Sequence, residues 1–327
     1  MGRLRVSVAF WNYDRTLPIA DGRVRIDGCE LCCSVLRPQE LFPRAFGTGE
    51  FEVAELSFVR YMMACSRGSS LYTALPVFPS RTFRHASIYV RRDRGIRQPK
   101  DLKGRTLGLN NYDDTAAVVA RGMLRDDYGI EIPDITWCIG DLEAKQAPRV
   151  ALEVLPLSVR LIRARDGETL DAMLAAGELD GIVSIVPPPC FRSGHPAIVR
   201  LFPDWRAAER DWFRHTRHFP IMHVIGIRNT LLASEPWLAR SLFDAFCRAK
   251  DLAIAELDNL QATKVTLPWA AAELAETRRV LGADFWPYGM AANRSAIERQ
   301  IRYASEDGLL TRVLTSDELF VQELLST

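Results

Sequence analysis

The densest group of side chains able to bind an anion lies in residues 76–85, which read PVFPSRTFRH. Arg81 and Arg84 stand three positions apart, and a guanidinium holds a carboxylate in a two-pronged, hydrogen-bonded fork. Two prolines fix the segment between two predicted strands, so we interpret it as a binding loop. The alternative is a surface loop with solvated arginines, because loops carry charge as well as function. The remaining candidates of this segment are Ser80, Thr82, Phe83 and His85.

A second candidate, His223, follows Phe-Pro-Ile-Met at the start of an apolar, strand-like run. A histidine is the side chain best suited to exchange a proton near neutral pH. The alternative is a core histidine bonded to a carbonyl oxygen. His218 lies five positions earlier, which is not a zinc-ligand spacing, so no metal site is predicted.

Residues 110–115 join a buried strand to a helix, where backbone N–H groups and side-chain amides can bind an anion. Asp113 and Asp114 would repel a carboxylate and suit a capping role instead, which we favour. The candidates for ligand contact in this segment are Asn110, Asn111, Tyr112 and Thr115.

Two further segments offer flat aromatic surfaces with polar neighbours. Trp286 begins the run Trp-Pro-Tyr-Gly, and Asn293 and Arg294 follow shortly after, as in a pocket for a planar ligand or in a packed turn between helices. Tyr13 and Arg15 come just after the first predicted strand. The chain has no phosphate-binding glycine loop and no G-x-S-x-G nucleophile motif, so no cofactor is predicted.

These residues are positioned by alternating strands and helices, which predict parallel sheets built from βαβ units. Strands are expected over residues 4–10, 53–57, 86–90, 106–109, 135–138, 180–185 and 223–228. The clearest helix is expected over residues 115–128, with Gly129 ending it. A second long helix is expected from Glu235-Pro236-Trp237 to Leu257, capped by Ser234. Shorter helices are expected after residue 57, at 169–176 and from 270 onward.

The chain has 327 residues, 48% of them hydrophobic and 25% charged, which is enough to build about two domains with substantial cores. The formal net charge of +1 favours neither nucleic acid nor a membrane surface as partner. Seven scattered cysteines without zinc spacing are typical of reduced thiols in a cytosolic protein. The N-terminal pattern predicts a strand rather than a signal peptide, and no run approaches the ~20 apolar residues of a membrane span. We therefore predict a cytoplasmic location.

The domain arrangement follows from the strand-helix units. Residues 1–94 and 223–327 are predicted to form one discontinuous domain, and residues 95–222 an inserted second domain whose return lies between 187 and 222. In such folds a ligand cleft is expected between the domains, at the carboxyl ends of strands.

Several segments together resemble the 4,5-dihydroxyphthalate decarboxylase family along nearly the whole chain. They include YDRT at 13–16, PVFPSRTFRH at 76–85, DLKGRTLG at 101–108, TAAVVARGMLRDDYG at 115–129, FPIMHV at 219–224 and FWPYG at 285–289. The resemblance implies an α/β fold of the type II periplasmic-binding-protein kind, with two lobes and an interdomain cleft. Residues 111–114 and 140–145 depart from the usual family pattern, which leaves the exact substrate open.

The resemblance also implies a carboxy-lyase of aromatic catabolism that converts 4,5-dihydroxyphthalate to protocatechuate. Under this hypothesis Arg81 and Arg84 anchor carboxylates, His223 or His85 donates the proton, and Trp286 and Phe83 stack on the ring. The partner is then a small aromatic carboxylate, and a homo-oligomer is possible. Two alternatives stay open: a binding or sensor protein of the same fold without chemistry, and an enzyme of this fold acting on a chorismate-derived acid.

Overall fold

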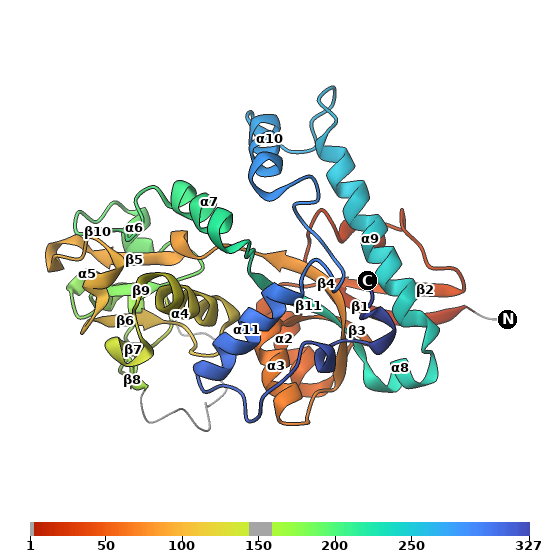
Figure 1. Ribbon diagram of the computed structural model, residues 1–327, viewed down its shortest axis with the longest axis horizontal. Coiled ribbons are helices and arrows are strands. Elements are labelled where there is room, and N and C mark those ends of the chain that lie inside the picture. Colours follow the sequence, from red (N-terminus) through yellow and green to blue (C-terminus); the bar gives the residue numbers. More distant parts are fainter. Residues whose placement is uncertain (1–2, 144–158) are drawn as a thin grey trace. The chain divides into compact units, whose positions relative to one another are not determined.

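The computed structural model describes residues 3–143 and 159–327. The chain divides into two compact units. Figure 1 shows the ribbon coloured along the sequence, from red at the N-terminus to blue at the C-terminus. Unit 1 comprises Met1–Arg81, Ile221–Glu298 and Leu314–Thr327, and unit 2 comprises Thr82–Pro220 and Arg299–Val313. Each unit is built around its own sheet.

Unit 1 contains a five-stranded sheet in the order β2-β1-β3-β11-β4. Strand β1 runs parallel to β2 and β3, whereas β11 runs antiparallel to both β3 and β4. The strands are β1 (Leu4–Phe10), β2 (Cys29–Val35), β3 (Val53–Ser57), β4 (Tyr72–Arg81) and β11 (Ile221–Arg228). The predicted strands at 4–10 and 53–57 are confirmed, and the one at 223–228 begins two residues earlier than expected.

These directions bring four chain ends to one edge of the sheet. The carboxyl ends of β1, β3 and β4 and the amino end of β11 all lie there, since β11 opposes its two neighbours. The carboxyl edge of a sheet is where α/β proteins gather ligand contacts. The edge therefore collects Tyr13, Ser80, Arg81 and His223 from distant parts of the chain.

The segment 76–85 is not a loop throughout, which corrects the sequence-based interpretation. Residues 76–81 continue β4, and Arg81 and Arg84 are 6% and 5% exposed, so the solvated-loop alternative is wrong. Proline is tolerated in an edge strand because its missing N–H costs no ladder bond on the open side. Strand β4 is an edge strand, and its pairing with β11 is shifted near Ser80.

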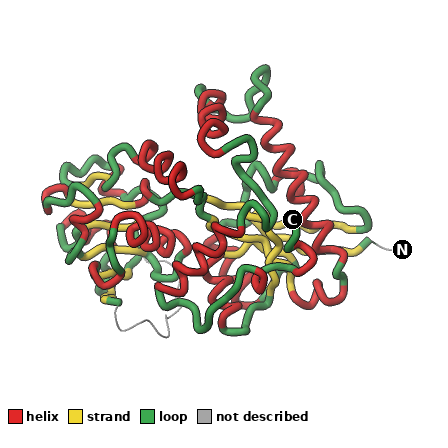
Figure 2. The backbone as a smooth tube through the Cα atoms, viewed as in Figure 1, coloured by secondary structure: helices red, strands yellow, loops and turns green. Residues whose placement is uncertain are grey.

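Figure 2 separates the helices of unit 1 from strands and loops by colour. They are α1 (Leu17–Ala20), α2 (Pro38–Thr48), α3 (Phe58–Ser66), α8 (Asn229–Ser234), α9 (Trp237–Leu257) and α10 (Ala270–Leu281), with short turns η5 (Asp317–Leu319) and η6 (Gln322–Leu324) near the end. Ser234 does not cap α9, contrary to prediction, because it belongs to α8 and Pro236 takes the capping position.

Unit 2 contains a six-stranded sheet in the order β10-β5-β9-β6-β7-β8. Strands β9, β6, β7 and β8 are mutually parallel neighbours, and β5 pairs antiparallel with β9 and β10. The strands are β5 (Ile88–Arg91), β6 (Thr106–Leu109), β7 (Thr136–Ile139), β8 (Arg160–Arg163), β9 (Gly181–Val183) and β10 (Ile198–Arg200). The predicted domain boundaries stay a prediction, but β5 joins this sheet although residues up to 94 were assigned to the first domain.

The helices of unit 2 are α4 (Thr115–Tyr128), α5 (Leu170–Ala176), α6 (Pro189–Arg192) and α7 (Trp205–Thr216), with turns η1 (His85–Ser87), η2 (Arg92–Arg94), η3 (Pro99–Leu102) and η4 (Ile132–Asp134). The predicted helix at 115–128 is confirmed, and Gly129 ends it with a φ of 64°, a left-handed conformation that glycine adopts without strain. Residues 144 and 145, part of the predicted family departure, lie outside the described residues.

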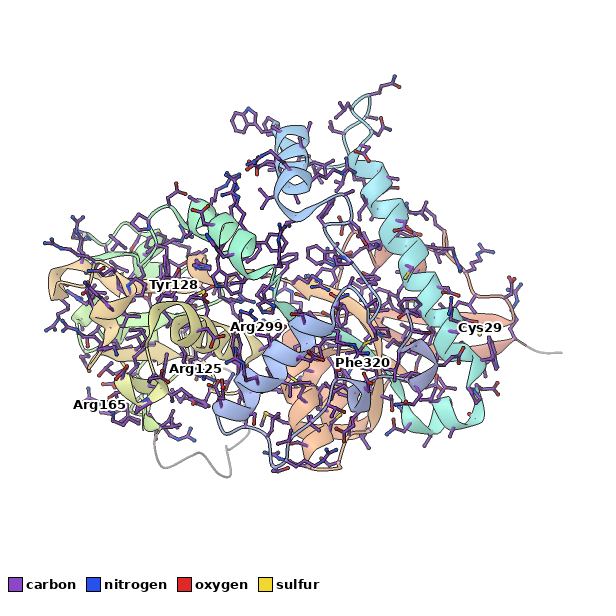
Figure 3. All side chains as sticks on the ribbon, in the orientation of Figure 1. Cys29, Arg125, Tyr128, Arg165, Arg299 and Phe320 are labelled. Atoms are coloured by element: carbon purple, nitrogen blue, oxygen red, sulfur yellow. The ribbon has the colours of Figure 1, made fainter. Side chains whose placement is uncertain are left out.

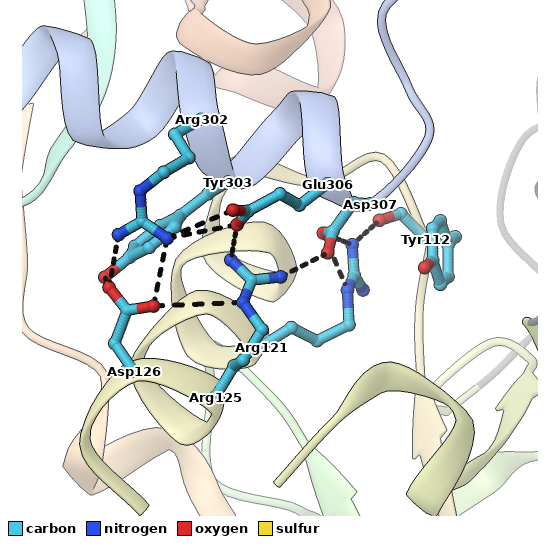
Figure 4. Close-up of polar contacts among 8 residues, drawn as sticks. All are labelled: Tyr112, Arg121, Arg125, Asp126, Arg302, Tyr303, Glu306 and Asp307. Atoms are coloured by element: carbon cyan, nitrogen blue, oxygen red, sulfur yellow. Dashed lines mark hydrogen bonds and ion pairs between the residues drawn. The ribbon is translucent and has the colours of Figure 1, made fainter. Parts of the chain in front are cut away.

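Helix α11 (Arg294–Glu306) supplies its second half to unit 2, where it packs on α4. Arg121 of α4 and Asp307 just after α11 form an ion pair at 2.6 Å with side chains only 2% and 0% exposed. Arg121 also donates to the Tyr112 carbonyl at 2.7 Å (Figure 4). Around this pair Arg125, Asp126, Arg302 and Glu306 form further ion pairs. This network fastens residues 299–307 to α4.

Among the described residues, none of the helices combines the length and apolar character needed to cross a membrane.

Candidate functional site

The polar centre of unit 1 is a contact between Glu55 in β3 and His223 in β11. The His223 Nδ1 atom lies 2.5 Å from Glu55 Oε1. His223 pairs in register with Ser57, two residues beyond Glu55, so the two side chains are diagonal neighbours on one face of the sheet. The Glu55 side chain is 0% exposed and that of His223 is 17% exposed. The histidine is thus the accessible member of a buried pair.

Two groups from the segment after β1 complete the surroundings of Glu55. The Trp11 backbone N–H donates to Oε2 at 2.8 Å, and the Tyr13 hydroxyl donates to Oε1 at 2.8 Å. Burial raises the pKa of Glu55, but the contacts with His223, Trp11 and Tyr13 outweigh it and leave that pKa below its ordinary value. Burial and the Glu55 charge raise the pKa of Tyr13 far above its ordinary value. At neutral pH the carboxyl is therefore ionised and the phenol is neutral.

Arg15 lies between two aromatic rings at the same edge. Its guanidinium carbon is 4.2 Å from the ring centres of both Tyr13 and Trp286. Its Nε donates to the Pro79 carbonyl at 2.6 Å, and Nη1 contacts Asp14 at 3.0 Å. Such cation–π contacts hold a charged group in one orientation. The sandwich brings together Tyr13, Arg15 and Trp286, all of which the sequence analysis proposed as ligand contacts.

Arg81 ends β4 as a buried cation. It donates to the Pro287 carbonyl at 3.0 Å and to the Asn293 side-chain oxygen. Burial lowers the pKa of Arg81 to about 9, which leaves it charged at neutral pH. A negative charge brought nearby offsets the cost of burying this cation. Arg81 is therefore suited to hold a carboxylate.

Asn293 and Arg294 are neighbours in sequence with different surroundings. Asn293 is 1% exposed, and its side-chain amide donates to the carbonyls of Pro287 and Gly289 at 3.1 and 2.7 Å. These bonds fix the side-chain oxygen of Asn293, which accepts a hydrogen bond from Arg81. Arg294 is bound to Asp317 at 2.5 Å and to the Ser316 hydroxyl at 2.8 Å. Its role as a ligand contact stays a prediction.

Unit 2 carries a second buried arginine, Arg84, close to the charge of Glu209 in α7. Burial lowers the pKa of Arg84 to about 10, while the charges of Glu209 and Asp114 oppose that shift. The Glu209 carboxylate accepts from the Ala86 backbone N–H at 3.3 Å. Burial raises the pKa of Glu209 to about 7, against the effects of the Ala86 N–H, Arg84 and Arg200. A carboxyl that titrates near neutrality thus accompanies Arg84.

His85, the other candidate proton donor, is 0% exposed within an aromatic cluster of unit 2. Its ring centre lies 4.9 Å from Phe202, 5.6 Å from Trp212 and 6.3 Å from Tyr128, which is labelled in Figure 3. Neither ring nitrogen has a hydrogen-bond partner among the described residues. Burial lowers the pKa of His85 to about 4, so the ring is neutral at physiological pH. His85 is thus buried in an aromatic core, without the carbonyl partner expected of a core histidine in the described part of the chain.

The other predicted contacts of unit 2 differ in accessibility. Thr82 is exposed and its N–H donates to the Pro220 carbonyl at 3.1 Å, while Phe83 stacks on Phe219 at 4.8 Å. Asn110 and Asn111 are half-buried, and Thr115 is the first residue of α4. Tyr112 is 0% exposed with its ring 3.8 Å from the Arg121 guanidinium carbon, so it is a core residue in this structure.

The predicted site residues therefore fall into two groups. Unit 1 contains Tyr13, Arg15, Ser80, Arg81, His223, Trp286, Asn293 and Arg294, while unit 2 contains Thr82, Phe83, Arg84, His85, Asn110, Asn111, Tyr112 and Thr115. Sequence reasoning missed Glu55. A lone carboxylate in the otherwise apolar run Val-Ala-Glu-Leu-Ser was the available indication, because a buried charge needs a partner.

Among residues 3–143 and 159–327, no group of three or more His, Cys, Asp or Glu side chains is placed to hold a metal ion. The predictions about metals and cofactors stay predictions.

Comparison with solved structures defines the class of protein. The periplasmic aliphatic sulphonate binding protein SsuA from Escherichia coli matches all of both chains with a TM-score of 0.57 at 12% identity. A mutant of DSZB, solved in complex with biphenyl-2-sulfinic acid, matches 98% of this chain and 97% of its own with a TM-score of 0.52 at 17% identity. At such identities the likeness shows the fold, which is the predicted α/β fold of the type II periplasmic-binding-protein kind.

Sequence comparison then places the chain within that class. It is 42% identical over 321 residues to the 4,5-dihydroxyphthalate decarboxylase of Comamonas testosteroni, covering 98% of this chain and 97% of that protein. It is also 42% identical over 214 residues to the protein of that name from Pseudomonas putida, covering 65% and 83%. No protein-family model matches the chain. The chain belongs to the 4,5-dihydroxyphthalate decarboxylase family, which confirms the predicted class of carboxy-lyase over a binding protein.

Proposed function

We propose that this protein removes CO₂ from 4,5-dihydroxyphthalate, or a close hydroxylated analogue, and releases protocatechuate. The observation that carries the proposal is the 42% identity to the Comamonas testosteroni enzyme across 98% of this chain. The cationic and aromatic edge of unit 1 supports it, because a planar dicarboxylate needs fixed positive charge and flat apolar surface. A cytoplasmic location and a homo-oligomeric state remain part of the proposal.

In this proposal Arg81 and Arg15 supply the positive charge of unit 1. A carboxylate held by a guanidinium keeps its orientation through two parallel hydrogen bonds. Trp286 offers its ring beside Arg15 for contact with the aromatic substrate. These residues bind the substrate, and a separate residue must donate the proton to the ring carbon.

In this proposal His223 is the proton donor, because its side chain is partly exposed and is held by the buried Glu55. A hydroxyl para to the departing carboxylate pushes electrons toward the carboxylate-bearing carbon, which takes a proton from His223. The carbon–carbon bond then breaks, its electron pair restores the aromatic ring, and CO₂ leaves. The sum is one dicarboxylate and one proton giving one monocarboxylate and CO₂. The neutral, enclosed His85 has no such access in its aromatic cluster.

Turnover of three phthalates tests the reaction and its electron flow. 4,5-Dihydroxyphthalate should yield CO₂ and protocatechuate, and in deuterated water one deuterium should enter the ring at the vacated carbon. 4-Hydroxyphthalate should lose the carboxylate para to its hydroxyl and give 3-hydroxybenzoate. Phthalate, without a hydroxyl, should bind without turnover. Chromatography of the products with mass spectrometry measures all three.

Two results would contradict the proposal. Tight binding of 4,5-dihydroxyphthalate without release of CO₂ would support a binding or sensor protein instead. Formation of 4-hydroxybenzoate from 4-hydroxyphthalate would refute electron donation from the para position, because that product requires loss of the meta carboxylate.

A further inference from the structure

We propose that Glu55 is a positioning residue that fixes the proton of His223 on Nδ1, so that Nε2 is the nitrogen that exchanges a proton with the substrate carbon. The inference rests on the proposed function for its catalytic consequence. Its structural part concerns the ring of His223 itself and is testable without substrate.

Glu55 is ionised although it is buried. Its side chain is 0% exposed, and a buried carboxylate is costly unless several donors surround it. Trp11 N–H and the Tyr13 hydroxyl supply two of these donors at 2.8 Å each. Together with His223 they make ionisation favourable in spite of burial. Glu55 is thus a fixed negative charge inside the sheet of unit 1.

The charge of Glu55 determines which nitrogen of the His223 imidazole carries a hydrogen. An ionised carboxylate accepts hydrogen bonds and donates none. At 2.5 Å from Glu55 Oε1, the His223 Nδ1 atom must therefore carry a hydrogen. In the neutral ring the other nitrogen, Nε2, is then the unprotonated one. Protonation and deprotonation of His223 accordingly take place at Nε2.

Neighbouring side chains fix the orientation of the His223 ring. The Phe42 ring meets the His223 ring edge to face at 5.0 Å between centres, and the Tyr13 hydroxyl lies 3.4 Å from Nδ1. The Tyr13 hydroxyl shares Oε1 with Nδ1, which fixes the acceptor atom. His223 also lies between β3 and β4, in register with Ser57 and Ser80. The ring is thus held from several sides, and its Nε2 points away from the carboxylate.

The arrangement resembles in logic the carboxylate–histidine pairs that set a tautomer in acid–base catalysis. Without the carboxylate, a neutral His223 can place its hydrogen on either nitrogen. A ring with hydrogen on Nε2 and none on Nδ1 cannot cycle a proton at the substrate-facing position. Glu55 therefore acts through His223 and touches no substrate atom.

The direct test is nitrogen-15 NMR of the histidine rings in the unliganded full-length protein. The chain has five histidines, and His223→Gln identifies the signals of His223 by their loss. In the wild type at a pH where the ring is neutral, Nδ1 should show the chemical shift of a protonated nitrogen and Nε2 that of an unprotonated one. The reverse pattern would overturn the proposal whatever the enzymatic activity proves to be.

Glu55→Gln then tests the catalytic part. The amide keeps the size of the side chain but removes the charge, so the His223 hydrogen should redistribute between the two nitrogens. The value of kcat should fall by about 10-fold or more, up to the ~10²–10⁴-fold that a general acid supplies. KM should change by less than about threefold, because the binding arginines are intact. Glu55→Asp, which keeps the charge, should restore part of the Nδ1–H pattern and of kcat.

Glu52→Gln is the matched control. Glu52 lies just before β3 and accepts the Ser7 N–H at 2.7 Å, as Glu55 accepts a backbone N–H, but it lies at the other end of the strand. Its replacement should leave both the His223 signals and kcat unchanged. An unaltered tautomer and unaltered kcat in Glu55→Gln would refute the inference. If wild-type protein shows the predicted tautomer but decarboxylates none of the phthalates, the positioning stands and the proposed function fails.

Discussion

Two histidines in this chain occupy opposite electrical surroundings, and that contrast separates their roles. His223 faces an ionised carboxylate and keeps contact with solvent, whereas His85 is enclosed by Phe202, Trp212 and Tyr128. Burial opposes a charged imidazole at His85 and lowers its pKa to about 4. Residue type and position in the sequence do not distinguish these cases, since both histidines stand beside predicted strands.

The enclosure of His85 predicts acid sensitivity of the fold. Its pKa falls from 6.5 in the unfolded chain to about 4 in the folded one. Above pH 6.5 the ring is neutral in both states; as the pH falls to about 4, the unfolded state gains the proton first and stability is lost. The loss levels off below that range at about 3 kcal/mol. Denaturant unfolding of wild type and His85→Leu at several pH values measures the difference.

In His85→Leu this contribution disappears, while the titration of the carboxylates is common to both proteins and cancels in the difference. The stability difference between wild type and variant should therefore shift in favour of the variant as the pH falls from 6.5 to 4. Parallel stability curves over that interval would show that His85 does not carry the effect.

At this scale the sequence indicated arginines and His223 as candidates, but not Glu55, the residue that His223 contacts. Arg81, Arg15 and Trp286 could be proposed because arginine and tryptophan have strong chemical preferences. Glu55 could not, because its contact with His223 joins strands 168 positions apart along the chain and depends on their register. A sequence read without pairing information cannot supply that register.

At the scale of elements, the contact between α4 and α11 depends on a residue without a side chain. A Cβ atom added to Gly122 would lie 2.2 Å from Cδ2 of the Tyr303 ring, which is closer than such atoms approach. Tyr303 is itself buried and its hydroxyl contacts Asp126 at 3.0 Å, so the ring cannot easily withdraw. Gly122 is thus required by packing rather than by backbone conformation.

Gly122→Ala should therefore destabilise the protein although alanine favours helices. The gain in helix propensity is at most about 1 kcal/mol, and overpacking a close helix contact costs about 1–3 kcal/mol. Gly47→Ala is the control, because Gly47 lies within α2 and a Cβ there meets nothing within 4 Å. Thermal unfolding should show a lower midpoint for Gly122→Ala and an unchanged or higher one for Gly47→Ala. Equal effects at both positions would exclude the Tyr303 contact as the cause.

Elements with strong local patterns could be predicted, and elements defined by pairing could not. The helix at 115–128 has a continuous apolar face and a terminal glycine, and its predicted bounds match α4. Strand β4 was taken for a loop from residue 76 onward, since two prolines suggested a break. Its place at the sheet edge, which tolerates proline, is a property of the assembled sheet.

At the scale of the whole molecule, each unit is assembled from separate stretches of chain. Unit 2 needs residues 299–313 in addition to residues 82–220. The late segment brings Asp307 to Arg121 and the Tyr303 ring to Gly122. Breaking a buried ion pair by removing one member costs about 3–5 kcal/mol. The predicted inserted domain, 95–222, lacked this segment because residue spacing gives no indication of it.

A fragment of residues 82–220 should therefore lack cooperative unfolding, because Arg121 would be left without its carboxylate. Addition of a peptide of residues 299–313 should restore a cooperative thermal transition, measured by circular dichroism. A peptide carrying Asp307→Asn and Tyr303→Ala should restore little. A sharp transition of the fragment without any peptide would show that the late segment is dispensable.

The order of strands in unit 1 has a consequence for how the protein is made. Strand β11, which begins at Ile221, lies between β3 and β4. The two earlier strands therefore lack their shared neighbour strand while the ribosome synthesises the 139 residues 82–220 of unit 2. Unpaired strand flanks recruit other chains into intermolecular sheets. A nascent polypeptide stalled before Ile221 should accordingly bind chaperones that shield extended segments. A polypeptide that extends beyond Arg228 contains β11, which can pair with β3 and β4, and should bind such chaperones less.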